Sequence, residues 1–189
     1  MCNNYVFRPP DARLFSHLKL GGDIAYPFGK PNLGPGEVRI GDRAPIVLRY
    51  EGEPALIVAP WAWKSPQGRP VFNFRSEGRS FAGSERCLIP ADGFFEFTDA
   101  QPGETRKTKW LFSLSGHANF WIAGIVKHGA FAMLTTDPGP DVKPYHDRQV
   151  VVLEPERGLD WLDLRRPEAE LLRPLEAESL TVERVWPPA

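Results

Sequence analysis

The stretch RCLIPADGFFEF, residues 86–97, decides the fold. An apolar run at residues 86–90 is followed by an Asp-Gly pair, typical of tight turns, and then by an aromatic run at residues 94–98. Both runs have the length and the residue types of β-strands. Side chains of a strand alternate between its two faces, so Glu96 is expected on the face opposite Phe95. A carboxylate beside aromatic rings is either exposed or has a raised pKa suited to acid–base catalysis, and the sequence leaves both open.

Proline and glycine are frequent on both sides of this stretch, with 20 and 17 residues in a chain of 189. This composition favours short elements joined by turns. Strands are expected at residues 44–50, 55–59, 86–90, 94–98, 110–114, 120–126, 130–135, 149–153 and 180–185. Short helices are expected at residues 11–20, 156–164 and 167–175, and a loop at residues 27–45. The pattern predicts an α+β fold, mixed and mostly antiparallel, in one domain that spans residues 1–189.

The overall composition is that of an ordinary globular protein, with 42% hydrophobic and 25% charged residues. The formal net charge is −1, so the chain has no overall basic field, and any nucleic-acid site must be a local patch. The first residues contain no apolar segment typical of a secretory signal, and no apolar run is long enough to cross a bilayer. We therefore expect a cytoplasmic protein without membrane partners.

The counts of cysteine and histidine argue against two kinds of site. Two cysteines are too few for a disulfide framework or a thiolate metal site. The four histidines show no metal-ligand spacing. We therefore expect no metal or other cofactor, and we interpret Cys87 as an apolar core residue.

Cys2 differs from an internal cysteine because loss of Met1 would place a free α-amine beside its thiol. The amine can attack an aldehyde to form a Schiff base, and the thiol can then close on the imine carbon to give a thiazolidine ring. The two groups ordinarily titrate at about 7.7–8.0 and 8.5, so modest help from neighbours makes both nucleophilic. Taken alone, a cysteine at position 2 is more simply explained by chance.

Two further segments carry polar residues in patterned surroundings. In FNFRSE, residues 72–77, Asn73 and Arg75 alternate with aromatic residues, as in an extended segment with two faces. An asparagine can accept from an ammonium and an arginine can bind phosphate, although an edge strand with a surface arginine is the simpler explanation of this segment alone. His146 precedes an apolar strand and has charged neighbours, which favours titration near neutral pH.

Together these motifs resemble the SOS-response-associated peptidase (SRAP) family of abasic-site sensors. The resemblance covers most of the chain. Each motif is weak alone, but their order along the chain makes the set specific. The resemblance rests on the initial Met-Cys pair, on Asn73, Arg75 and Glu77, on residues 86–97, on residues 134–136, and on residues 146–148 before a valine-rich strand.

The resemblance implies roles for individual residues. Cys2 would be the covalent nucleophile, Asn73 would hold its α-amine, and Glu96 would move protons during ring opening and Schiff-base formation. His146 would assist the imine and act in crosslink reversal or strand incision. The implied partner is single-stranded DNA that contains an abasic site, bound by a monomer. DNA contacts are expected from Asn3, Asn4, Trp61, Trp63, Arg75, Thr135 and Arg148.

The family resemblance also implies β-barrel-like sheets and a positively charged groove, and the chain departs from the family at three places. Where the family usually has Gly-Arg after the cysteine, Asn3 and Asn4 stand here, so one charge-assisted phosphate contact is missing. The usual Trp-Gly is replaced by a segment in which Trp61 and Trp63 are expected to supply a stacking surface. A further family loop is reduced to residues 32–35.

Two functions of other classes remain open. A peptidase or amidase could use Cys2 as an N-terminal nucleophile, with Asn73 and Glu96 as orienting and acid–base groups. A non-catalytic protein could bind single-stranded DNA through a groove alone. Separately, the polar residues 101–109 are interpreted as a solvated hairpin loop between two strands. An aldehyde in DNA separates the three functions, because only abasic-site processing gives a crosslink.

Overall fold

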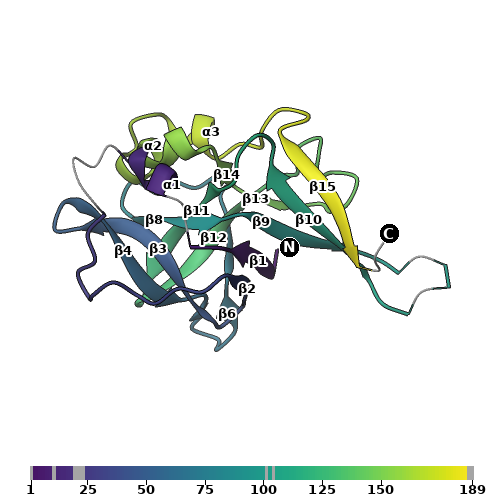
Figure 1. Cartoon of the computed structure of the whole chain (residues 1–189), viewed down its shortest axis with the longest axis horizontal. Coiled ribbons are helices and arrows are strands. Elements are labelled where there is room, and N and C mark those ends of the chain that lie inside the picture. The colour runs from purple at the N-terminus through teal and green to yellow at the C-terminus, as the bar shows by residue number, and fades with distance from the viewer. Residues whose placement is uncertain (1, 10–11, 19–23, 101, 104, 187–189) are drawn as a thin grey trace.

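The computed structural model describes residues 2–9, 12–18, 24–100, 102–103 and 105–186, most of which lie in two sheets (Figure 1). The first sheet has the order β15 (Leu180–Trp186), β10 (Thr108–Leu114), β9 (Gly93–Thr98), β1 (Asn4–Phe7) and β2 (Gly36–Arg39). The second has the order β13 (Gln149–Val150), β12 (Ala130–Thr136), β11 (Phe120–Lys127), β8 (Glu85–Ala91), β3 (Arg43–Tyr50) and β4 (Glu53–Pro60), with β14 (Val152–Leu153) beside β11 and β7 (Asn73–Arg75) beside β12. A small hairpin pairs β5 (Trp63–Lys64) with β6 (Pro70–Val71).

Antiparallel pairing dominates both sheets, which confirms the predicted α+β class. Among the described strands, β7 and β12 form the one parallel pair. Neither strand order returns to its first member, so the sheets stay open in the described chain and do not close into the barrel that the family resemblance implies. The helices of the described chain are few and short, as predicted: α1 (Ala12–Ser16), η1 (Pro155–Arg157), α2 (Gly158–Asp163) and α3 (Glu168–Leu171).

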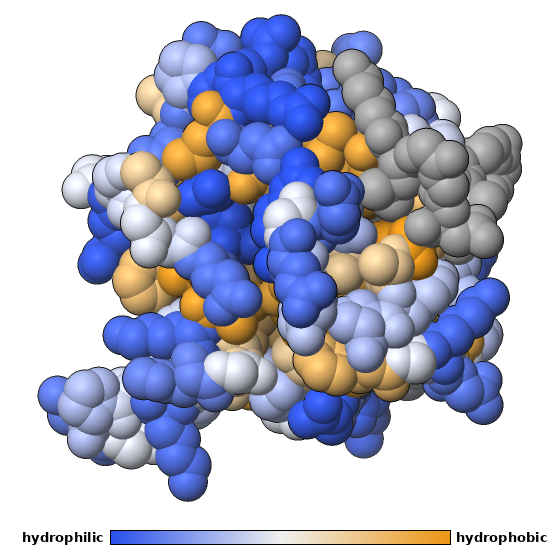
Figure 2. Space-filling model, turned by 90° about the vertical axis from the view of Figure 1, so that its left-hand side faces the viewer, coloured by the Kyte–Doolittle hydropathy of each residue, from blue (hydrophilic) through white to orange (hydrophobic). Residues whose placement is uncertain are grey.

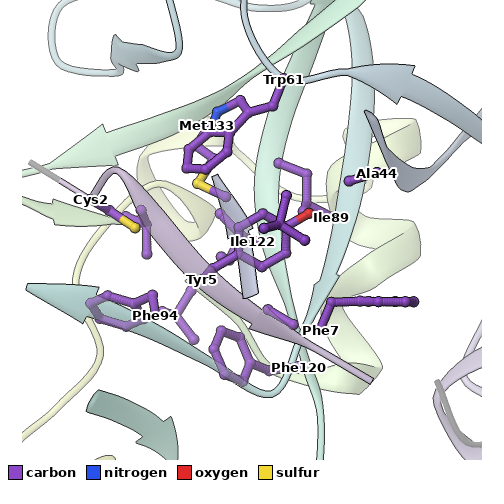
Figure 3. Packing of buried hydrophobic residues seen from close by; sticks show 14 of the residues in the cluster. Cys2, Tyr5, Phe7, Ala44, Trp61, Ile89, Phe94, Phe120, Ile122 and Met133 are labelled. Carbon is purple, nitrogen blue, oxygen red and sulfur yellow. The ribbon is translucent and has the colours of Figure 1, made fainter. Parts of the chain in front are cut away.

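The first sheet, the second sheet and the helices form three layers, and an apolar cluster lies between each neighbouring pair of layers. The first cluster fills the space between the two sheets, where Tyr5 and Phe94 of the first sheet meet Ile89 and Ile122 of the second (Figure 3). The second cluster covers the other face of the second sheet, where the helices pack and Trp161 of α2 is fully buried. Burial of each such side chain stabilises the fold by about 1.5–3 kcal/mol, so both faces of the second sheet are fixed by packing.

The stretch that decides the fold does not form the tight turn that its Asp-Gly pair predicts. β8 and β9 belong to different sheets, so the chain crosses from one sheet to the other at this pair. The Asp92 carboxylate accepts hydrogen bonds from the Arg8 backbone at 2.6 Å and from Asn119 Nδ2 at 2.9 Å. A Cβ on Gly93 would lie 2.9 Å from the Phe112 backbone carbonyl oxygen, so close approach to the backbone of β10 requires the glycine.

β1, β2, β5 and β6 lie where the sequence predicts no strand. β1 begins two residues after Cys2 and lies between β9 and β2. β2 and the start of β3 at Arg43 fall within the predicted loop at residues 27–45. Tyr5 pairs with Val38, and both side chains are buried. Pairing between distant segments therefore outweighs the local glycine and proline signals.

The helices are shorter than predicted. Of the predicted helix at residues 11–20, α1 forms the middle part, while residues 11 and 19–20 lie outside the described residues. α3 ends at Leu171, four residues before the end of the prediction. Pro174 disfavours the helical conformation of Arg173, the residue that precedes it, and so limits the helix.

Polar residues cover most of the face at the left of Figure 1, and the apolar residues on that face form small, separate patches (Figure 2). Scattered apolar residues of this kind are usual on protein surfaces. None of the described helices is long and apolar enough to span a membrane.

Candidate active site

A pocket of about 610 Å³ lies beside the first sheet. Three parts of the chain contribute to it: the N-terminal segment, the strands β9, β10 and β15 with the β9–β10 loop, and the loop that precedes β13. Two of the four predicted catalytic residues are in its lining. The lining residues are Asn3, Glu96, Phe97, Arg106, Lys107, Lys109, His146 and Trp186.

Glu96 is held in β9 opposite Trp110 of β10 and is only 1% exposed. Of the two environments that the sequence leaves open, the buried one is therefore observed. Burial raises the pKa of the Glu96 carboxyl to about 7, and a hydrogen bond from the Cys2 backbone acts against that rise. At neutral pH the carboxyl is near its midpoint, so it can both donate and accept a proton.

His146 ends a short turn, where its backbone N–H donates to the Val142 carbonyl at 3.0 Å. Its Nε2 lies 3.7 Å from Glu96 Oε2. His146 Nδ1 faces the Arg148 backbone N–H at 3.0 Å, the Arg148 carbonyl at 3.1 Å and Asp147 Oδ1 at 2.9 Å, so it has both a donor and two acceptors within reach, and either ring nitrogen can carry the proton of the neutral ring. Burial lowers the pKa of His146 below its usual value, so the ring is neutral at neutral pH.

Cys2 lies directly before β1, at the edge of the core near Phe94 (Figure 3). It is 1% exposed, and its Sγ donates to the Asn4 carbonyl at 3.2 Å. Burial raises the pKa of the Cys2 thiol to about 12, and the nearby Glu96 carboxylate adds to the rise. The thiol therefore keeps its proton at neutral pH, in contrast to the ordinary value that the sequence alone suggests.

Asn73 reaches Cys2 from β7 in the second sheet. Its Nδ2 donates to the Cys2 carbonyl at 2.7 Å, whereas its Oδ1 is buried without a hydrogen-bond partner among the described residues. A buried acceptor without a donor costs about 1–3 kcal/mol. The α-amine of a chain that starts at Cys2 would be a donor of the required kind.

These contacts connect the four predicted catalytic residues in one path. Asn73 binds the Cys2 carbonyl, the Cys2 backbone donates to Glu96, and Glu96 faces His146. The path joins the cysteine next to the start of the chain to two groups that titrate, Glu96 and His146. In the described part of the chain, no group of three or more His, Cys, Asp or Glu side chains is arranged to hold a metal ion.

Arg148 and Thr135 are buried, although the sequence predicts that they contact DNA. They are 7% and 1% exposed. Arg148 Nη2 donates to Glu77 Oε2 at 2.9 Å and to Thr135 Oγ1 at 3.1 Å, and Nη1 donates to Asp137 Oδ1 at 2.8 Å. We call this group the Arg148 clamp. It joins the end of β7 to β12 and holds the backbone that positions His146.

Of the other residues expected to contact DNA, Asn3 and Arg75 are exposed and Asn4 is buried. Asn3 is exposed and lines the pocket, and Arg75 is exposed at the end of β7, so both can reach a bound strand. Asn4 is 6% exposed, and its Nδ2 donates to Glu37 Oε2 at 2.8 Å. Asn4 therefore supports the sheet and does not take the place of a phosphate-binding arginine.

The two tryptophans that were expected to stack on bases belong to the core. Trp61 is fully buried, donates from Nε1 to the Phe72 carbonyl at 2.9 Å, and stacks on Phe131 with 6.3 Å between ring centroids. Trp63 is 8% exposed. Neither ring presents a free face to a nucleobase.

Sequence reasoning missed five residues of the pocket, of which Phe97 neighbours Glu96 in β9. Arg106, Lys107 and Lys109 lie in the segment that was interpreted as a solvated loop, and Trp186 lies at the end of β15. Three cations in four positions were a signal for a local basic patch. No local signal could place Trp186, because it reaches the pocket through the pairing of β15 with β10.

Comparison with known families gives one match that covers most of the chain. Residues 56–187 match the profile of the family described as SOS response associated peptidase (SRAP). Abasic site processing protein YoqW of Bacillus subtilis (strain 168) is 28% identical over 149 residues, which cover 68% of this chain and 66% of YoqW. Abasic site processing protein YoaM of the same organism is 27% identical, with 68% and 65% covered. The chain thus spans just under two thirds of these relatives.

Solved structures show the same fold at low sequence identity. The crystal structure of a phage-related protein from Bordetella bronchiseptica superposes with a TM-score of 0.70 and 24% identity, covering 98% of this chain and 94% of that one. A protein from Bacteroides thetaiotaomicron superposes with a TM-score of 0.68 and 18% identity. These likenesses concern the arrangement of the two sheets.

Proposed function

Because the chain belongs to the SRAP family, we propose that it processes abasic sites in single-stranded DNA through a covalent bond to Cys2 after loss of Met1. The names of its relatives, which describe abasic site processing, support this substrate. The observation that carries the proposal is the contact path from Asn73 through Cys2 and Glu96 to His146.

The first part of the reaction is imine formation. An abasic sugar is mainly a closed hemiacetal, so ring opening must release its aldehyde. Glu96, with a pKa of about 7, donates a proton to one oxygen and removes one from the other. The neutral α-amine of Cys2 then adds to the aldehyde carbon, and a proton from Glu96 leaves with the hydroxyl of the carbinolamine as water.

The second part is ring closure by the thiol. The Cys2 sulfur adds to the imine carbon, the carbon–sulfur bond forms, and the electron pair of the C=N π bond passes to nitrogen. The Glu96 carboxylate takes the thiol proton and returns it to that nitrogen, which a thiol with a pKa of about 12 requires. The net change is loss of one water, without an oxidant or reductant.

His146 serves the reverse reaction and strand incision. Its Nε2 lies 3.7 Å from Glu96 Oε2, so the two groups can pass a proton between them. Protonation of the thiazolidine sulfur reopens the imine. Removal of a proton from the sugar carbon next to the imine then expels the 3′-phosphate by β-elimination. Lyase activity is therefore part of the same proposal.

The test uses an oligonucleotide with one abasic site. We expect an adduct that survives a denaturing gel and whose intact mass equals the chain without Met1 plus the DNA, less one water. Cys2→Ala should abolish the heat-stable adduct, because its amine can form only the imine. The matched control, Cys87→Ala, removes the other cysteine and should crosslink normally.

Two substrate controls separate the alternatives. DNA whose aldehyde has been reduced to an alcohol should give no adduct. A chain that retains Met1 and still forms the adduct would exclude the thiazolidine. Cleavage of a peptide that depends on Cys2, in the absence of any adduct, would favour the hydrolase. Binding of the oligonucleotide with neither reaction would favour a non-catalytic DNA-binding protein.

A further inference from the structure

Trp186 is an exposed aromatic residue at the rim of the pocket. It is 45% exposed, and β15 places it opposite Lys109 of β10. Glu96 and His146 line the same pocket. An indole ring left in contact with water next to a reactive site is a surface that a flat apolar group can cover.

Positive charge surrounds this ring. The Arg106 guanidinium lies 5.9 Å from the centroid of the Trp186 ring, within the range of a cation–π contact. Lys107 lines the pocket beside it, and its Nζ is 3.4 Å from Asp99 in a pair that is 66% and 96% exposed. Such an exposed pair is weak and does not prevent binding of an anion.

A flat apolar face beside guanidinium and ammonium groups matches the chemistry of a nucleotide. Bases of single-stranded nucleic acid stack on aromatic rings, while cations follow the backbone phosphates. An abasic sugar has no base of its own to stack. If the sugar lies near Glu96 and His146, the nearest base belongs to the adjoining nucleotide and lies towards the rim.

We propose that Trp186 stacks on the base that adjoins the abasic site and that Arg106 binds the phosphate between that base and the lesion. This inference rests on the proposed function for the position of the sugar. It adds a contact that selects a strand with an intact neighbouring nucleotide. Because every base has a π face, the contact is independent of sequence.

The test measures equilibrium binding of labelled DNA that contains a tetrahydrofuran residue, which mimics the abasic sugar and has no aldehyde. One oligonucleotide carries normal bases on both sides of this residue, and a second lacks both flanking bases. Trp186→Ala should weaken binding of the first about 5- to 100-fold and of the second less than twofold. Trp186→Phe, which keeps an aromatic ring, should retain most of the affinity that Trp186→Ala loses.

Phe28→Ala is the matched control, because Phe28 is another exposed aromatic residue, 75% exposed, that does not line the pocket. It should leave binding of both oligonucleotides unchanged. An equal loss for both oligonucleotides with Trp186→Ala, or no loss for either, would overturn the inference. Failure of the proposed function gives a different result. If binding of tetrahydrofuran DNA depends on Trp186 but true abasic DNA forms no crosslink, the proposed covalent reaction is wrong and the stacking contact of Trp186 is still supported.

Discussion

The Glu96 carboxyl has a pKa of about 7 because burial disfavours its charged form. Below this pH the folded protein holds the proton that ring opening and loss of water need, and above it the proton is lost. The α-amine, by contrast, becomes nucleophilic only as it deprotonates, at about pH 7.7–8.0. The crosslinking rate should therefore rise and then fall across neutral pH, with a maximum near the two pKa values.

Glu96→Gln keeps the size of this side chain but cannot transfer a proton. We expect crosslinking to slow by about 10²–10⁴-fold, with DNA binding unchanged. The alkaline fall in rate should disappear, so that the variant becomes steadily faster up to a plateau as the amine deprotonates. Adduct formation followed over time at several pH values measures both effects. A variant with the rate and the pH profile of the wild type would show that Glu96 is only structural.

His146→Ala separates the two directions of the reaction. A neutral ring facing Glu96 can take part in reopening the thiazolidine and in removing the sugar proton. We therefore expect strand incision and crosslink reversal to fall by about 10²-fold or more, and crosslink formation to fall less. Adduct and cleaved strand are measured separately on one oligonucleotide, and reversal by transfer to a second, competing abasic strand. Loss of DNA binding in place of chemistry would contradict this role.

At the scale of elements, the Arg148 clamp ties strands to the site. Arg148 is 7% exposed and binds Glu77 after β7, Thr135 in β12 and the nearby Asp137. Arg148→Leu should lower the free energy of unfolding by about 2–3 kcal/mol, because it removes several charge-assisted bonds and leaves Thr135 without a donor. Chemical denaturation measures this loss.

The matched control for the clamp is Arg157→Leu. Arg157 also forms ion pairs with carboxylates, but its side chain is 38% exposed. Exposed pairs contribute little, so its loss should cost at most about 1 kcal/mol. Equal losses for the two variants would mean that the clamp is an ordinary surface network.

Local sequence patterns predicted where strands lie better than which strands pair with one another. The strand at residues 120–126 is a continuous apolar run, and it forms β11 with ends that differ by at most one residue. β2 was missed because Gly36 and the prolines around it signal a loop, while its strand form depends on pairing with β1. The Asp-Gly pair predicted a turn, yet packing of two sheets made it a crossing.

The candidate site was predictable only where a motif preserved it. Cys2, Asn73, Glu96 and His146 could be named from the sequence and do lie along one contact path. The burial of Trp61 could not be read locally, because a tryptophan suits a core as well as a stacking surface. The exposure of Trp186 depends on where β15 ends, which is a property of the assembled sheet.

For the whole molecule, the position of the N-terminal segment links fold and site. Cys2 leads directly into β1, and β1 is held between β9 and β2. Asn73 from the second sheet binds the same residue. Residues at a chain end are ordinarily mobile, but strand pairing within one sheet and a hydrogen bond from the other sheet hold the backbone around Cys2. The two-sheet core therefore supplies the orientation that the proposed chemistry needs.

The charge distribution of the whole molecule predicts how salt affects the proposed binding of DNA. The net charge is −1, so attraction to DNA must come from local cations such as Arg106 and Lys107 at the pocket. Each phosphate contact contributes a slope of about −0.7 to the dependence of log binding constant on log salt concentration for a single strand. Replacing both residues by glutamine should therefore flatten the slope by about 1.4 if each binds one phosphate. Lys127→Gln, an exposed lysine outside the pocket lining, should leave the slope unchanged. Titrations of undamaged single-stranded DNA at several salt concentrations measure all three slopes, and equal slopes would place the bound strand elsewhere on the surface.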